Sequence, residues 1–211
     1  NPWWTAELQR EMEADFARDP DLAEHVWNGL PRKQGERAII SRAAIRAAMN
    51  RNLPLEPGAP VEIGCDVARF GDDLTTIYKR QGPKVIAYEK LVRADTQEVA
   101  RRVWDMADRS NRVRVKVDDD GVGGGVTDKL REMGAQVVPV HNGGAPFDDA
   151  RYTSVADEMW FGFSERINTV DIPNDDDLMA ELAGRLYKYT PHDQRKIEPK
   201  EDFRKRYARS P

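Results

Sequence analysis

The chain has 211 residues, 39% hydrophobic and 33% charged, which is enough for one sizeable soluble domain with a core and a highly charged surface. Its formal net charge of −4 means that any nucleic-acid binding must come from local basic patches rather than from the field of the whole protein. The lone Cys65 excludes an internal disulfide and fits a reducing compartment, and no apolar run reaches the roughly 18 residues of a membrane span.

Residues 1–30 are predicted to be helical, residues 31–37 are predicted to be a polar linker, and a second helix and then a boundary are predicted to follow. Apolar residues recur every four positions from Trp4 to Met12, and a second helix is predicted from Ala38 to Met49. Three prolines and a glycine then follow within residues 54–60. We therefore expect residues 1–53 to be a helical extension and residues 61–211 to be the main domain.

Residues 61–91 predict an antiparallel meander. In residues 61–68, apolar Val61, Ile63, Cys65 and Val67 alternate with Glu62, Gly64, Asp66 and Ala68, which is the period of a strand with one apolar face. Two further strands are predicted over residues 74–80 and 84–91. Connections as short as these join antiparallel neighbours.

The next segment predicts a change to strand–helix–strand order. Asp95 to Glu98 has the form of a capping box that opens a helix. A fourth strand is predicted over residues 112–117 and a fifth over 137–140, with a helix between them that Gly134 ends. The predicted fold class is therefore α/β, with a mixed sheet of three antiparallel strands followed by parallel strands, flanked by helices.

The last third of the chain predicts three more helices and a hairpin. Tyr152, Val155, Met159 and Phe163 form an apolar stripe typical of a helix, and Asp175 is the expected N-cap of the next one. The remaining predicted elements are a hairpin formed by residues 187–190 and 196–198, and a short basic helix over residues 201–209.

Asp66 and Asp118 stand at the carboxyl ends of two predicted strands, each on the face opposite the apolar residues. If these strands are neighbours about 4.8 Å apart, both carboxylates reach one point on one face. Two divalent ions about 3.5–4 Å apart would relieve the repulsion, activate a water and stabilise the leaving oxygen of a phosphodiester. Mg²⁺ or Mn²⁺ suits such oxygen ligands better than zinc. The alternative is that the two aspartates are simply turn formers.

Neighbouring residues offer weaker signals. Asp72, Asp73, Asp119 and Asp120 fit turn and cap positions, although Asp73 is also a candidate to orient a metal-bound water. Residues 121–125 contain four glycines but lack the Gly-Lys-Ser/Thr end of a phosphate loop, so a close backbone approach explains them better than a nucleotide. His141 fits a loop residue better than a catalytic one. The candidate DNA-binding residues are Arg69, Lys200, Arg204, Lys205, Arg206 and Arg209, with the basic face of residues 112–116 as a weaker candidate.

Several of these stretches resemble the nuclease domain of the large terminase subunit of tailed bacteriophages, a ribonuclease H-like fold. Residues 24–31 resemble the segment that joins the motor ATPase of that family to its nuclease. The matching stretches of residues 61–211 are Gly64 to Asp73, Val117-Asp118 with Gly121 to Gly123, Arg151 to Trp160, and Ile197-Glu198 through Arg204 to Arg206 and on to Pro211.

The resemblance implies a metal-dependent endonuclease that cuts concatemeric double-stranded viral DNA during packaging. It implies Asp66 and Asp118 as the first two of three acidic ligands for Mg²⁺ or Mn²⁺, and it places the third, an aspartate, directly after Pro211, where this sequence stops. The implied partners are double-stranded DNA, an ATPase domain of the same protein, the portal and the small terminase subunit, in the cytoplasm of an infected bacterium. No membrane partner is implied.

Two other functions stay open at this point. The chain could serve mainly as a DNA-gripping and docking module of the packaging motor, with its nuclease latent. A nucleotide-binding α/β domain that uses residues 121–125 is the other alternative.

Overall fold

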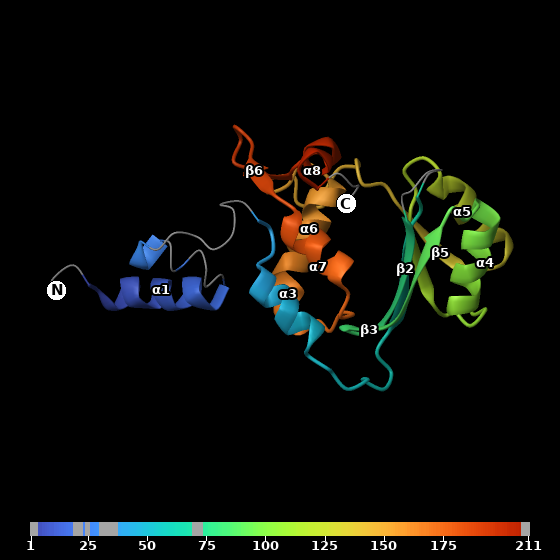
Figure 1. The fold of residues 1–211 in the computed structure, drawn as a ribbon, viewed down its shortest axis with the longest axis horizontal. Coiled ribbons are helices and arrows are strands. Elements are labelled where there is room, and N and C mark those ends of the chain that lie inside the picture. Colours follow the sequence, from blue (N-terminus) through green and yellow to red (C-terminus); the bar gives the residue numbers. More distant parts are fainter. Residues whose placement is uncertain (1–3, 19–22, 24–25, 30–37, 69–73, 208–211) are drawn as a thin grey trace.

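The computed structural model describes residues 4–18, 23, 26–29, 38–68 and 74–207 (Figure 1). Among these residues, no helix combines the length and the apolar character that crossing a membrane demands. The helices are α1 (Ala6–Arg18), α3 (Arg42–Met49), α4 (Thr96–Met106), α5 (Gly123–Glu132), α6 (Val155–Arg166), the 3-10 turn η1 (Ile167–Thr169), α7 (Asp176–Gly184) and α8 (Lys200–Tyr207). The strands are β1 (Val61–Asp66), β2 (Leu74–Gln81), β3 (Lys84–Val92), β4 (Arg114–Asp118), β5 (Gln136–Val140), β6 (Tyr187–Tyr189) and β7 (Arg195–Ile197).

The main sheet has five strands in the order β3-β2-β1-β4-β5. β1 pairs with β2 and β2 with β3 in antiparallel fashion, whereas β1 pairs with β4 and β4 with β5 in parallel. The parallel pair β4 and β5 is joined through helix α5, because parallel neighbours need a crossover connection. The predicted mixed sheet is confirmed, and β6 and β7 form the predicted hairpin apart from it.

Helices α4 and α5 cover one face of the sheet (Figure 1). The apolar alternation of the strands supplies that core, with Ile63 and Cys65 from β1 and Val115 and Val117 from β4 all buried. The predicted cap of α4 forms as expected, since the Asp95 carboxylate accepts a hydrogen bond from the backbone N–H of Glu98 at 2.8 Å. The opposite sheet face therefore carries the polar half of each strand, and both candidate aspartates belong to it.

A second core joins α3, α6, α7 and η1. The prediction of a helix from Ala38 to Met49 is wrong in its first turn, because the helix begins only at Arg42, with Ser41 as its N-cap. Residues 38–40 are instead held by pairing: Ala38 bridges to Leu186, and the Ile39 N–H donates to the Arg185 carbonyl at 3.0 Å. The division of the chain at residues 54–60 stays a prediction, although α3 on its amino-terminal side packs against α7 and η1.

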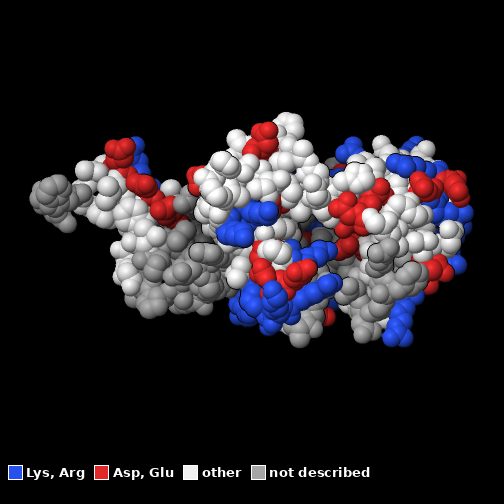
Figure 2. Space-filling model, turned by 90° about the horizontal axis from the view of Figure 1, so that it is seen from above, with Lys and Arg blue, Asp and Glu red and all other residues white. Residues whose placement is uncertain are grey.

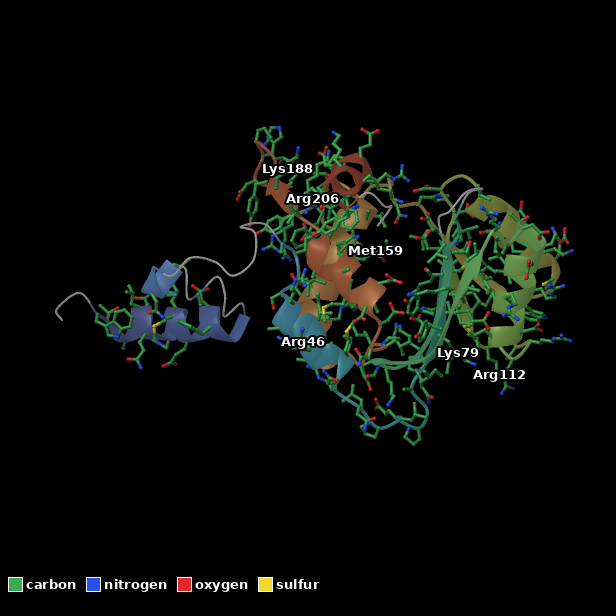
Figure 3. The ribbon with its side chains drawn as sticks, in the orientation of Figure 1. Arg46, Lys79, Arg112, Met159, Lys188 and Arg206 are labelled. Carbon is green, nitrogen blue, oxygen red and sulfur yellow. The ribbon has the colours of Figure 1, made fainter. Side chains whose placement is uncertain are left out.

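Helix α6 forms as predicted, but it does not bury the stripe that its sequence suggested. Tyr152 is buried ahead of the helix, and Met159 is 46% exposed (Figure 3). The buried positions within α6 are Asp157 and Phe161. A buried carboxylate breaks the apolar pattern from which helix faces are predicted, so the true inward face was hidden in the sequence.

One ion pair connects the sheet to α7 and predicts a pH dependence of stability. The Lys90 ammonium on β3 lies 2.7 Å from the carboxylate of Asp175, the N-cap of α7. Burial alone would raise the pKa of Asp175, but the Lys90 hydrogen bond, the Leu178 N–H and the Lys90 charge together lower it. Burial would lower the pKa of Lys90, but bonds to Asp175 and Asp177 raise it. Each group therefore stabilises the charged form of the other.

We expect Lys90→Met to lower the free energy of unfolding by about 1 kcal/mol at pH 7, because it removes this half-buried pair. Asp175 has a lowered pKa in the folded state, so its contribution is present above its unfolded pKa of about 3.9 and is lost as pH falls through the folded value. The deficit of the variant should thus shrink below pH 4 in urea titrations. Lys205→Met, which removes an exposed pair with Asp202, is the control and should change nothing measurable. A Lys90→Met deficit of equal size at pH 3 and pH 7 would contradict the assignment.

Candidate active site

Asp66 and Asp118 lie at matching ends of neighbouring strands. β1 and β4 run parallel with Cys65 opposite Val117, so the next residue of each strand is one of the two aspartates. Burial, together with the charges of Asp66 and Asp118, raises the pKa of Cys65 to about 12. The thiol between them is therefore a neutral core group, while both carboxylates lie close to it on the other face of the sheet.

Asn142 fixes the orientation of Asp118. The Asn142 side-chain amide donates to Oδ2 of Asp118 at 2.8 Å, and the Asp120 N–H donates to Oδ1 at 3.2 Å. Asn142 is itself held, because its backbone N–H donates to Asp120 Oδ2 at 2.8 Å and its carbonyl accepts from the Ala156 N–H at 3.0 Å. Asn142 is a residue that the sequence patterns alone do not single out. The available signal was its position just after β5, since the carboxyl ends of parallel strands share one sheet edge.

The glycine-rich segment, residues 121–125, packs tightly against the carboxyl end of β4. A Cβ on Gly123, the first residue of α5, would lie 1.7 Å from the backbone oxygen of Asp118, which no side chain can tolerate. Gly121 has a φ of +88°, in the left-handed region that favours glycine. The predicted close approach of the backbone is confirmed at Gly123, while the positive φ accounts for Gly121, and neither position needs a bound nucleotide.

Asp119, Asp120 and His141 lie in the loops that follow β4 and β5, next to Asp118. The Thr127 hydroxyl donates to Asp119 Oδ1 at 2.5 Å, which ties that carboxylate to α5. His141 lies at the same edge, with Nε2 3.9 Å from Asp119 Oδ2 and Nδ1 3.5 Å from Asp120 Oδ1. These contacts agree with turn and cap roles for Asp119 and Asp120, and they place a half-exposed imidazole beside the carboxylates.

The candidate DNA-binding residues fall into two groups. Arg69 and Arg209, like Asp73, lie outside the described residues. The others lie on α8, where Lys200, Arg204 and Lys205 are exposed and Arg206 contacts Glu198 and the Gly184 carbonyl. Figure 2 views the molecule from above and shows basic side chains gathered over its middle beside acidic ones. All four of these α8 cations are thus exposed, and Arg206 is also held by Glu198 and the Gly184 carbonyl.

The donor atoms fit a hard divalent cation. Asp66 and Asp118 offer carboxylate oxygens, which Mg²⁺ and Mn²⁺ prefer, and Asn142 orients one of these carboxylates in the way that outer hydrogen bonds orient metal ligands. Within the ranges that the structure describes, no group of three or more His, Cys, Asp or Glu side chains is placed to hold a metal ion. The described residues bring these two strand-end carboxylates to one edge of the sheet.

Comparison with known proteins gives matches in structure only. A scan against protein-family models finds no match, and a search of curated proteins also finds none. The nuclease domain of the large terminase subunit gp2 of bacterial virus Sf6 matches with a TM-score of 0.66 and 16% identity, covering 82% of this chain and 93% of that chain. A mutant of that domain with manganese and β-thujaplicinol matches with a TM-score of 0.68 at 17% identity, with the same coverage.

A second phage nuclease has the same fold. The large terminase nuclease of thermophilic phage G20c with bound magnesium matches with a TM-score of 0.57 and 16% identity, covering 78% of this chain and 88% of that chain. At such identities the likeness establishes the fold. The predicted mixed sheet flanked by helices is therefore confirmed as the fold of phage terminase nuclease domains.

Proposed function

We propose that this chain is a metal-dependent DNA endonuclease, the nuclease domain of a phage terminase large subunit. One observation carries the proposal: Asp66 and Asp118 end adjacent parallel strands in register and on the same face. The similar folds include a phage terminase nuclease with manganese and another with magnesium. Two strand-end carboxylates that serve only as turn formers would have no reason to share one edge and one face.

Each residue of the site has a distinct task in this proposal. Asp66 and Asp118 hold Mg²⁺ or Mn²⁺, which when bound supplies Lewis-acid stabilisation of the phosphodiester and lowers the pKa of a water. Asn142 keeps the Asp118 carboxylate aimed at the site through its 2.8 Å hydrogen bond. Gly123 lets α5 begin directly against the end of β4, which holds the Asp118 backbone in place. The exposed cations of α8 bind the DNA backbone.

The resemblance also guides the proposal on metal number and on the third ligand. We propose two ions, with the third carboxylate supplied by an aspartate directly after Pro211. A chain lengthened by one aspartate after Pro211 would then bind Mn²⁺ more tightly than one lengthened by asparagine.

The larger setting follows from the proposed family. The substrate is concatemeric double-stranded DNA, cut into genome lengths in the cytoplasm of the infected bacterium. Residues 1–53 link this domain to an ATPase domain of the same protein, and the portal and the small terminase subunit are the further partners. ATP-driven translocation belongs to the ATPase domain.

Plasmid nicking tests the proposal. We expect supercoiled plasmid to become nicked and linear with Mg²⁺ or Mn²⁺, to stay intact with EDTA, and to be cut again when excess metal is restored. The physical reason is that water attacks a phosphodiester slowly unless charge on the phosphate is neutralised. Plasmid that both this chain and the chain lengthened by an aspartate after Pro211 bind tightly but leave intact would favour the DNA-gripping module instead.

A further inference from the structure

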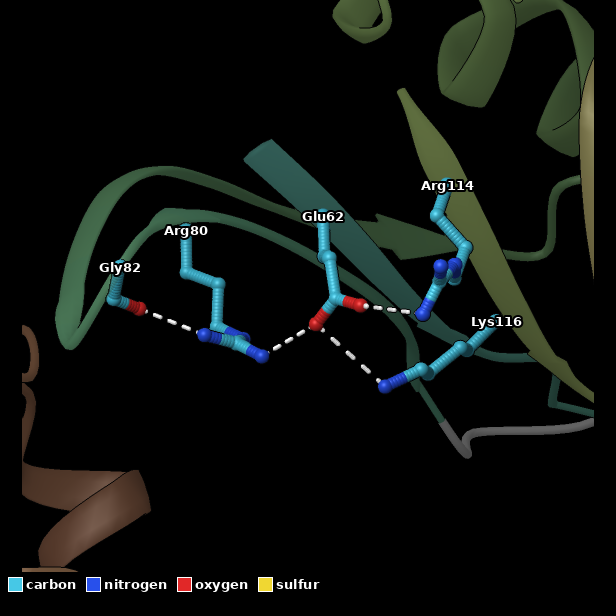
Figure 4. Close-up of polar contacts among 5 residues, drawn as sticks. All are labelled: Glu62, Arg80, Gly82, Arg114 and Lys116. Carbon is cyan, nitrogen blue, oxygen red and sulfur yellow. Dashed lines mark hydrogen bonds and ion pairs between the residues drawn. The ribbon is translucent and has the colours of Figure 1, made fainter. Parts of the chain in front are cut away.

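A buried carboxylate on the polar sheet face gathers three basic side chains. Glu62 of β1 is 8% exposed and lies between its two Cα partners, Arg80 on β2 and Arg114 on β4. It contacts Arg80 Nη2 directly, and its oxygens lie 3.4 Å from Arg114 Nη1 and 3.3 Å from Lys116 Nζ (Figure 4). We call these four residues the Glu62 cluster.

The Glu62 cluster has more positive charge than its own structure requires. Burial would raise the pKa of Glu62, but the charges of Arg80, Lys116 and Arg114 lower it, so Glu62 is ionised at neutral pH. Three cations and one carboxylate leave a net charge of +2. The three basic side chains are 46%, 53% and 44% exposed for Arg80, Arg114 and Lys116, so they stay in reach of a ligand.

The Glu62 cluster lies on the same sheet face as the candidate active site, a few residues earlier along β1 and β4. Lys116 and Arg114 precede Asp118 by two and four residues on the same strand and the same face, which is about 7 and 13 Å at about 3.3 Å per residue. Gly64 lies between Glu62 and Asp66, and a Cβ there would meet nothing within 4 Å. The row from Arg114 to Asp118 therefore has open space beside it at Gly64 on β1.

The acidic first turn of α7 does not cancel this charge. Its Asp175 and Asp177 carboxylates pair with Lys90 on β3 at 2.7 and 3.4 Å. β3 is separated from β1 by β2 and lies farther still from β4, although the charges of Asp175 and Glu181 also act on Tyr78 of β2, which pairs with Gly64 of β1. Within the Glu62 cluster itself, three cations still face one carboxylate on β1, β2 and β4.

We propose that the Glu62 cluster is a phosphate-binding track for the DNA strand that enters the Asp66 and Asp118 site. This inference rests on the proposed nuclease function and extends it to a surface beyond α8. A distance of about 13 Å spans about four phosphates of one strand at about 3.4 Å of axial rise each. Glu62 has two tasks: its ion pairs fix the positions of the three basic side chains, and its charge lowers the net positive charge of the cluster.

Salt-dependent DNA binding tests the track. The probe is a fluorescent 20-base-pair duplex in EDTA, with Asp66→Asn in every protein so that nothing is cut. For Arg80→Gln, Arg114→Gln and Lys116→Gln, we expect the slope of log affinity against log salt to fall by about 1 for each cation removed. Glu62→Gln removes a negative charge and so raises the net positive charge of the cluster. We expect it to raise the affinity for DNA roughly threefold or more near 50 mM salt.

Control variants show whether the effect belongs to the Glu62 cluster or follows the loss of any surface cation. Lys129→Gln and Arg131→Gln remove two ion-paired cations from α5, which packs on the opposite face of the sheet, and should leave the slope unchanged. Thermal unfolding checks that each variant is folded. If Glu62→Gln does not fold, Arg114→Gln decides the question, since its side chain is half exposed.

The outcomes also separate the track from the nuclease. Unchanged slopes in the cluster variants, with plasmid nicking by the unmodified chain, would overturn the track and leave the nuclease proposal standing. Reduced slopes without metal-dependent nicking, by this chain and also by the chain lengthened by an aspartate after Pro211, would support the track as a DNA contact and overturn the nuclease. A cluster that serves folding alone predicts lower melting temperatures with no change in DNA affinity, which also contradicts the track.

Discussion

Asp118→Asn should reduce plasmid nicking by at least about a thousandfold while the protein stays folded. The substitution keeps the size of the side chain and the backbone contacts of α5, but it removes the charge that holds a divalent cation. Lewis-acid stabilisation of a phosphoryl transition state is worth several kcal/mol, and about 4 kcal/mol corresponds to about a thousandfold in rate. The measurement is the initial nicking rate at saturating Mn²⁺, with the melting temperature recorded in parallel.

Asn142→Ser provides the matched comparison. It removes the 2.8 Å hydrogen bond to Asp118 but leaves the carboxylate charge in place, so we expect a loss of about tenfold that higher Mn²⁺ partly restores. Asp149→Asn, in the exposed loop before α6, should nick at the normal rate. Equal rates for Asp118→Asn and the unmodified chain would remove Asp118 from the site.

Asp157→Ala should cause a loss of stability as large as that of truncating a buried apolar side chain of the second core. Asp157 is 1% exposed, and its carboxylate accepts hydrogen bonds from the Thr153 hydroxyl at 2.5 Å, the Ser154 hydroxyl at 2.8 Å and the Ile197 N–H at 2.8 Å. Alanine leaves these donors without their acceptor, which we expect to cost about 3 kcal/mol. For a chain of this size, that lowers the melting temperature by about 6–12 °C.

The reason for this effect is the position of Asp157 between distant parts of the chain. Its bond to Ile197 fastens β7 to the amino-terminal turn of α6, about forty residues earlier in the sequence. Asp149→Ala, which truncates an exposed carboxylate near the same helix, should shift the melting temperature by less than about 2 °C. A shift for Asp157→Ala no larger than that of the control would show that the buried hydrogen bonds contribute little.

The sheet was predictable because its signals are local. Alternating apolar residues in β1 and β4 placed Asp66 and Asp118 on the polar face, and short turns identified the antiparallel strands. The parallel pairing of β1 with β4 then brought the two aspartates to one edge as expected. The roles of these residues as metal ligands stay a prediction.

Features that depend on contacts between distant residues were not predictable. Asn142 approaches Asp118 only because β5 pairs with β4, and Glu62 meets Arg80 and Arg114 only through the register of three strands. The sequence alone predicts Asp157 to be an exposed polar residue of a helix, because its partner Ile197 lies on the distant strand β7. Buried polar groups follow the fold rather than the hydrophobic pattern, so sequence periodicity assigns them to the surface.

The most direct test of the central claim is the position of Mn²⁺ in crystals of this chain, located by its anomalous scattering. We predict a peak within about 2.5 Å of carboxylate oxygens of both Asp66 and Asp118, and no such peak in Asp118→Asn crystals grown in the same way. Crystals at saturating Mn²⁺ that show no peak between these two carboxylates would contradict the account.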